Sequence, residues 1–223
     1  MPDGAPETPA LGRRLKIVRR AAWALILVTT MAAAGFAGWK TFAPAKPPTA
    51  RQVGEALIKT QFNLTDHYGR AVKEKDFRGQ WQLVFFGYTF CPDVCPTTLS
   101  VMARALDLLG DDAAKVAPLF ITVDPGRDTP EVLAEFVGAF HPRIVGLTGT
   151  QEQIKAAAKS FRIYVGRVDK PDVPGGYLMG HSGYMYLMTP EGTYDAVFSE
   201  NRNPPEDIAA AIKKRLTKER SGR

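Results

Sequence analysis

Apolar residues along the chain fall into runs and helical stripes that predict a sheet covered by helices. The runs Trp81–Phe86 and Leu119–Val123 are apolar at almost every position, which is typical of strands buried on both faces. Each run is followed by an apolar stripe with helical spacing, and two further stripes come later. The four stripes are Leu99, Met102, Leu106 and Leu109, then Val132, Leu133, Phe136, Val137 and Phe140, then Ile154, Ala157, Ala158 and Phe161, and finally Ile208, Ile212 and Leu216. This alternation of strand and helix predicts an α/β fold.

Shorter elements extend this core at both ends. Phe62 and Leu64 alternate with polar neighbours ahead of a turn at residues 65–69, which predicts an N-terminal hairpin. The segment Arg167–Gly180 is rich in Pro and Gly, and we expect it to form a loop. The remaining predicted strands are Ile144–Leu147, Arg162–Val168, Tyr184–Met188 and Tyr194–Phe198. The whole order is typical of a thioredoxin-like sandwich with an N-terminal hairpin extension.

A long uncharged segment precedes this fold. Ala21–Trp39 contains 19 residues without a charge, about the length that crosses a bilayer. Basic residues cluster before it and Lys40 alone follows closely, so the positive-inside rule predicts a cytoplasmic N-terminus and an exported remainder. Small residues at 32–37 leave a cleaved signal peptide as the alternative, but the length of the segment favours an uncleaved anchor. The predicted organisation is a cytoplasmic segment 1–20, a transmembrane helix 21–39, a Pro-rich linker 40–52 and a folded domain 53–219.

The net charge of +6 is concentrated at the two ends of the chain. Residues 1–20 have a net charge of +3 and residues 212–223 of +5, so the rest of the chain carries −2. A nearly neutral domain argues against nucleic-acid binding.

The N-terminal segment indicates in which membrane the protein lies. Asp3 and Glu7 argue against a mitochondrial transit peptide, which is poor in acidic residues. We therefore expect a single-pass protein of a bacterial inner membrane, with its domain in the periplasm, rather than one of the mitochondrial inner membrane.

The two cysteines of the chain, Cys91 and Cys95, lie where a buried strand meets a predicted helix. Pro96 suits the first position of that helix, which places Cys95 at its N-cap and Cys91 one turn earlier. Unpaired N–H groups and the helix dipole favour thiolates there. The pair could close a disulfide or bind a soft metal such as Cu(I). Because a disulfide across so short a loop would stabilise the fold by only about 2 kcal/mol, we favour a reactive or metal-binding role.

The rest of a metal site must come from other residue types. Two cysteines are too few for a four-cysteine iron–sulfur cluster, and a closed zinc site would need two more ligands. Among the histidines, His67 lies in a turn, and we expect it to be solvated. His141 follows a helix, where interaction with the C-terminal end of the helix dipole explains its presence. His181 lies between the Gly-rich segment and the strand Tyr184–Met188, but imidazole serves many roles. The residue pattern by itself leaves the third ligand open.

Three motifs resemble the Sco/SenC family. They are Phe85–Pro96 (FFGYTFCPDVCP), Asp124–Pro130 (DPGRDTP) and His181–Leu187 (HSGYMYL), in that order. Proteins of this family are membrane-anchored, thioredoxin-like copper proteins that serve the assembly of the CuA centre of cytochrome c oxidase. The resemblance implies that Cys91, Cys95 and His181 bind copper, as Cu(I) or Cu(II), for delivery to the CuA site of cytochrome c oxidase subunit II.

Three functions stay open at this point. The first is delivery of copper, received from another periplasmic copper chaperone. The second is a thiol–disulfide oxidoreductase, in which Cys91 and Cys95 reduce the CuA-site cysteines and a thiol reductase regenerates them. The third is a copper or redox sensor. Asp124 and Arg127 have either a structural role before the helix that Thr129 caps or a supporting role at the site.

Overall fold

The chain divides into two units, residues 1–47 and residues 48–223. The computed structural model describes residues 19, 20, 22, 23, 25–31, 58, 61–199 and 201–221. In the first unit, all described residues are helical. Among the described residues, no helix has both the length and the hydropathy needed to cross a bilayer. The predicted anchor Ala21–Trp39 lies partly outside the described residues, and the predicted linker 40–52 lies wholly outside them.

The second unit is built on a seven-stranded sheet. Side by side, its strands are β2 (Ala71–Lys73), β1 (Asn63–Asp66), β5 (Val145–Thr148), β4 (Val116–Thr122), β3 (Trp81–Gly87), β8 (Met185–Met188) and β9 (Tyr194–Phe198). The strands β3, β4 and β5 are parallel, and the strands outside them pair antiparallel with their neighbours. Every residue of β3 and β4 is buried, as their apolar sequences predict. The predicted N-terminal hairpin is confirmed as β1 and β2.

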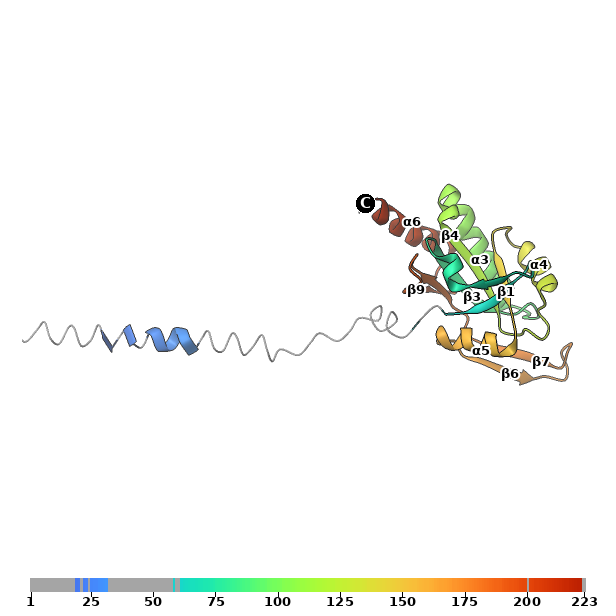
Figure 1. Ribbon diagram of the computed structural model, residues 1–223, viewed down its shortest axis with the longest axis horizontal. Helices are drawn as coiled ribbons and strands as arrows, with labels where there is room; N and C mark the ends of the chain where they lie inside the picture. Colours follow the sequence, from blue (N-terminus) through green and yellow to red (C-terminus); the bar gives the residue numbers. More distant parts are fainter. Residues whose placement is uncertain are drawn as a thin grey trace, which may run out of the picture. The chain divides into compact units, whose positions relative to one another are not determined.

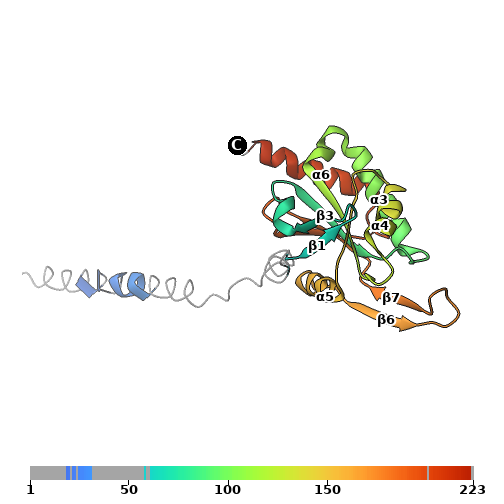
Figure 2. The ribbon, with the colours of Figure 1, turned by 45° about the vertical axis from the view of Figure 1, so that its right-hand side comes forward.

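Helices cover both faces of this sheet. They are α3 (Val94–Leu109), α4 (Pro130–Gly138), α5 (Gln151–Ser160) and α6 (Pro205–Ser221), with short 3-10 helices at Glu74–Phe77 and Gly110–Lys115. Figures 1 and 2 show α3, α4 and α6 on one side of the sheet and α5 on the other. The predicted apolar stripes of α3 and α6 are buried. The capping prediction at Thr129 is confirmed, because its side chain accepts a hydrogen bond from the backbone N–H of Val132.

The helix after the cysteines begins earlier than predicted. It starts at Val94 with Asp93 as its N-cap residue, so Cys95 lies within the first turn rather than at the N-cap. Pro96 is consequently the third residue of the helix. The first turn tolerates this proline because the backbone N–H groups there have no intrahelical partner to lose.

The prediction of a loop over Arg167–Gly180 is wrong. Strands β6 (Val165–Asp169) and β7 (Tyr177–His181) form a separate two-stranded antiparallel sheet, with Val165 opposite His181 at its base. Pro171, Pro174, Gly175 and Gly176 lie at the tip of this hairpin, where Gly175 and Gly176 have φ values of 81° and 74°. His181 is therefore the last residue of a strand.

Candidate metal centre

The carboxyl end of β3 supports the first turn of α3. Gly87 is the last residue of β3, and a Cβ atom added there would lie 2.8 Å from Cys95 Sγ and 2.8 Å from a ring carbon of Phe120. The absence of a side chain at residue 87 therefore lets α3 begin directly over the end of the strand. This close approach buries Cys95 completely, whereas Cys91 stays half-buried.

The structure brings Cys91, Cys95 and His181 together. The two Sγ atoms and one imidazole nitrogen all lie within 4.8 Å of one another. Cys95 Sγ is 3.4 Å from His181 Nε2, and the backbone N–H of Cys95 donates a hydrogen bond to Cys91 Sγ at 3.5 Å. A cavity of about 420 Å³ is lined in part by Cys91, His181 and Met179, whereas Cys95 lies buried behind them. Two sulfurs and one imidazole form a donor set that suits copper ions.

The orientation of the His181 ring leaves one nitrogen free to bind a metal. Its Nδ1 atom lies 3.2 Å from the carbonyl oxygen of Ser182, and a carbonyl can only accept a hydrogen bond. Nδ1 therefore carries the proton in the neutral ring, and Nε2 presents its lone pair to Cys95. The rings of Phe85 and Tyr88 meet the imidazole edge-on, with centroids 6.0 Å and 5.8 Å away. These edge-on contacts, together with the Nδ1 hydrogen bond, hold the imidazole in this orientation.

The two cysteines differ in protonation. A hydrogen bond from the Cys95 side chain lowers the pKa of Cys91 to about 3, although burial of Cys91 opposes this shift. The same hydrogen bond favours the protonated form of Cys95, and burial raises the pKa of that thiol further. The half-buried Cys91 is therefore a thiolate at neutral pH and the buried Cys95 is a thiol. This arrangement is suited both to thiol exchange and to capture of a metal ion that displaces the remaining proton.

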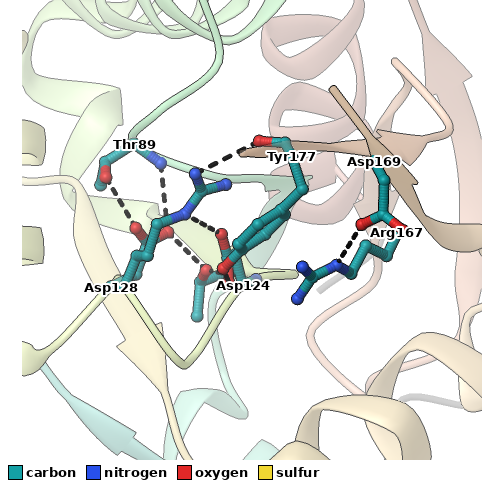
Figure 3. Close-up of polar contacts among 8 residues, drawn as sticks. Thr89, Asp124, Asp128, Arg167, Asp169 and Tyr177 are labelled. Atoms are coloured by element: carbon teal, nitrogen blue, oxygen red, sulfur yellow. Dashed lines mark hydrogen bonds and ion pairs between the residues drawn. The ribbon is translucent and has the colours of Figure 1, made fainter. Parts of the chain in front are cut away.

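A buried carboxylate holds the loop that leads to the cysteines. Asp128 accepts hydrogen bonds from the backbone N–H of Thr89 at 3.1 Å, from the Thr89 hydroxyl at 2.6 Å and from the Thr122 hydroxyl at 2.5 Å (Figure 3). Burial raises the pKa of Asp128 above the usual value of an aspartate, although these donors oppose the shift. Nothing in the sequence around Asp128 indicates this role, because its partner Thr89 lies 39 residues away.

The other two histidines make structural contacts. His67 accepts a hydrogen bond from the backbone N–H of Gly146 at 3.0 Å, so it links the turn after β1 to β5 rather than standing in solvent. His141 accepts one from the backbone N–H of Arg143 at 3.1 Å and lies 3.7 Å from Asp107. Neither belongs to the group of donor atoms that Cys91, Cys95 and His181 form.

Comparison with known proteins gives one consistent result. The family model of SCO1/SenC matches residues 50–217. The protein sco1 of Schizosaccharomyces pombe is 43% identical over 162 residues, which make up 72% of this chain and 61% of that protein. A solved structure of Bradyrhizobium japonicum ScoI with copper bound has 41% identity and a TM-score of 0.66, covering 70% of this chain and 98% of that one. The Arabidopsis thaliana ScoI structure with copper bound has 36% identity and a TM-score of 0.67, covering 72% of this chain and 99% of that one. The chain therefore belongs to the SCO1/SenC family.

Proposed function

We propose that this protein binds copper through Cys91 Sγ, Cys95 Sγ and His181 Nε2 and delivers it to the CuA site of cytochrome c oxidase subunit II. The observation that carries the proposal is the imidazole nitrogen 3.4 Å from a buried cysteine sulfur. A site built only for thiol exchange has no need of a histidine ligand. Thiolate and imidazole donors together suit copper, and relatives with copper bound have been crystallised.

The two cysteines have different roles when copper is loaded. The Cys91 thiolate faces the cavity and is the first group that an arriving copper ion meets. Binding then displaces the proton of Cys95, so that both sulfurs bind as thiolates. The cavity leaves one side of the ion accessible, where cysteines of a recipient protein can replace these ligands one at a time. Copper is thus the cargo of the protein.

Transfer to a recipient tests this proposal. Copper-loaded full-length protein in detergent is mixed with the metal-free CuA domain of subunit II, and the absorption of the CuA centre is recorded. We expect the signal to appear with the wild-type protein and to be lost with His181→Ala, whereas His141→Ala should transfer copper normally. A His181→Ala variant that matures the CuA domain at the wild-type rate would remove the ground for the proposal.

Thiol–disulfide exchange is the second candidate, favoured by the Cys91 thiolate beside the buried Cys95 thiol. In this reaction Cys91 attacks a disulfide of the target, which forms a mixed disulfide and releases one target sulfur as a thiolate. Cys95 loses its proton and attacks Cys91, which closes the Cys91–Cys95 disulfide and releases the second target sulfur. The target gains two electrons, and an external thiol reductase must restore the two cysteines.

We also propose a single-pass protein of a bacterial inner membrane, with residues 21–39 as anchor, 40–52 as linker and 53–219 as a periplasmic domain. The basic residues before position 21 support this orientation. A reporter enzyme that folds only outside the cytoplasm, fused after Arg223, should be active. Protection of the domain from protease in intact spheroplasts would contradict the orientation.

A further inference from the structure

The candidate ligand His181 is carried by a hairpin that stands apart from the main sheet. Among the described strands, β6 and β7 pair only with each other. Figures 1 and 2 show this hairpin at one edge of the domain, next to α5. No ladder of backbone hydrogen bonds joins β7 to β3, and the chain reaches the main sheet only after residues 182–184, at the start of β8. Side-chain contacts of β7 therefore contribute to the distance between His181 and the cysteines.

One face of β7 makes these contacts. Side chains alternate along a strand, so Tyr177, Met179 and His181 share a face. The Tyr177 hydroxyl donates a hydrogen bond to Asp124 Oδ1 at 2.9 Å (Figure 3). Met179 packs against the core, and His181 meets Cys95. Tyr177 is thus the polar attachment of the strand at the end opposite His181.

Arg127 joins that attachment to the cysteine loop. Its guanidinium group lies 3.8 Å from the ring centroid of Tyr177 and 4.7 Å from that of Phe90, the residue before Cys91. Its Nη1 donates a hydrogen bond to the carbonyl oxygen of Tyr177 at 3.3 Å. Its Nε donates to Asp124 Oδ2 at 2.5 Å, and both side chains of this ion pair are largely buried. One cation therefore touches the segment before Cys91 and the strand that ends at His181.

A second arginine contacts the same ring without making this link. The guanidinium of Arg167 lies 3.9 Å from the ring centroid of Tyr177, and its Nε donates to Asp169 at 2.9 Å. Arg167 and Asp169 both belong to β6, and Figure 3 shows Tyr177 between Asp124 on one side and Arg167 on the other. Arg167 therefore contacts the ring from within the hairpin, which makes it a matched control for Arg127.

We propose that Arg127, oriented by Asp124, is a positioning residue that holds β7 against the cysteine loop and so places His181 Nε2 beside the two sulfurs. Arg127 binds no metal and acts through Tyr177, four residues before the histidine on the same strand face. This inference rests on the proposed copper site and names Arg127 as the residue that positions His181, the third ligand of that site. A lysine cannot replace Arg127, because an ammonium group lacks the planar fork that stacks on rings and bonds Asp124 and Tyr177 at once.

Copper affinity in a double-mutant cycle tests the inference. The full-length reduced protein is titrated with Cu(I) against a competing chelator. We expect Arg127→Ala and Arg127→Lys to weaken binding about 10- to 100-fold, as loss of an outer-sphere partner does, and Arg167→Ala to leave it unchanged. In a His181→Ala background, Arg127→Ala should cause no further loss. An equal loss in both backgrounds would overturn the inference, because Arg127 would then act through the fold or the cysteines.

A second measurement needs no copper and separates this inference from the proposed function. In the metal-free reduced protein, NMR should show a cross-relaxation signal between the His181 ring and the Cys95 β-protons. Arg127→Ala should abolish that signal and speed amide exchange in β6 and β7 but not in β3. If the wild-type protein binds no copper while these changes occur, the proposed function fails and the positioning role stands. If Arg127→Ala leaves the signal and the exchange rates unchanged, the positioning role fails whatever the copper affinity.

Discussion

The Nε2 atom of His181 lies 3.4 Å from the Sγ atom of Cys95, although 86 positions separate the two residues in the sequence. Cys95 comes from the first turn of α3 on the main sheet, and His181 from the end of a hairpin outside it. Two separately built parts of the domain therefore meet at one group of donor atoms. Substitutions can therefore change the cysteines of α3 or the histidine of the hairpin separately.

Replacing His181 by alanine should separate copper binding from thiol chemistry. We expect Cu(I) affinity to fall by more than the roughly 10- to 100-fold typical of an outer-sphere change, because a direct ligand is lost. Cys91 and Cys95 should still form their disulfide. Chelator competition and thiol alkylation with mass analysis measure the two properties, with His141→Ala as the control histidine. Unchanged affinity in His181→Ala would exclude the imidazole as a ligand.

Cys91 should remain reactive in acid. Its pKa is lowered to about 3, so the thiolate persists as the pH falls from 8 towards 4. The rate of alkylation of Cys91 by iodoacetamide should change little over this range, whereas an ordinary thiol slows about tenfold per pH unit below its pKa. Cys95, whose pKa is raised, should react far more slowly at every pH. In Cys95→Ser, where the hydrogen bond comes from a hydroxyl, a Cys91 rate that already falls below pH 8 would contradict this assignment.

Oxidation should abolish copper binding. Formation of the Cys91–Cys95 disulfide consumes both thiolates and leaves His181 as the sole donor of the group. The protein is oxidised mildly, the disulfide is verified by mass after alkylation, and the bound metal is quantified against the reduced protein. Recovery of binding after reduction is the control for irreversible damage. Full copper retention by the oxidised form would place the metal elsewhere.

Loss of the buried carboxylate of Asp128 should destabilise the domain. In Asp128→Ala, the half-buried N–H of Thr89 and the buried hydroxyl of Thr122 lose their acceptor, and the unpaired buried hydroxyl alone lowers the free energy of unfolding by about 1–3 kcal/mol. Urea denaturation of the full-length protein measures the change. Asp169→Ala is the control, because its ion pair with Arg167 is exposed and contributes at most about 1 kcal/mol. Equal effects of the two substitutions would contradict the assigned role.

Much of the fold can be predicted from the sequence because buried strands and helices have characteristic patterns of apolar residues. Strands β3 and β4 are buried at every position and have almost continuous apolar runs. The hairpin β6–β7 leaves no such trace, since its residues are half-buried or exposed and its tip is rich in Pro and Gly. Its strands pair with each other and contact the rest of the domain through a few side chains of β7, so their stability depends on cross-strand pairs and single contacts rather than on a continuous buried face.

Only those residues of the candidate site that lie close together in the sequence could be predicted from the sequence pattern. Cys91 and Cys95 lie together in the sequence beside a helix start, and that context indicates thiolate chemistry. The assignment of His181 depended on family resemblance, because nothing in its neighbours distinguishes a ligand from another polar residue. The contact between Tyr177 and Asp124 joins residues 53 positions apart, so only the folded chain brings it into view.

The closeness of Gly87 to the cysteine sulfur has a consequence for the mutational tolerance of the chain. A side chain at residue 87 would meet both Cys95 Sγ and Phe120, each at 2.8 Å from its first carbon. Gly138, at the end of α4, has open space in the corresponding direction. In a library that samples every amino acid at these two positions, residue 138 should accept many and residue 87 should accept glycine alone. The packing of Cys95 and Phe120 thus imposes a strict size limit on a strand residue that contributes no atom to the candidate metal site.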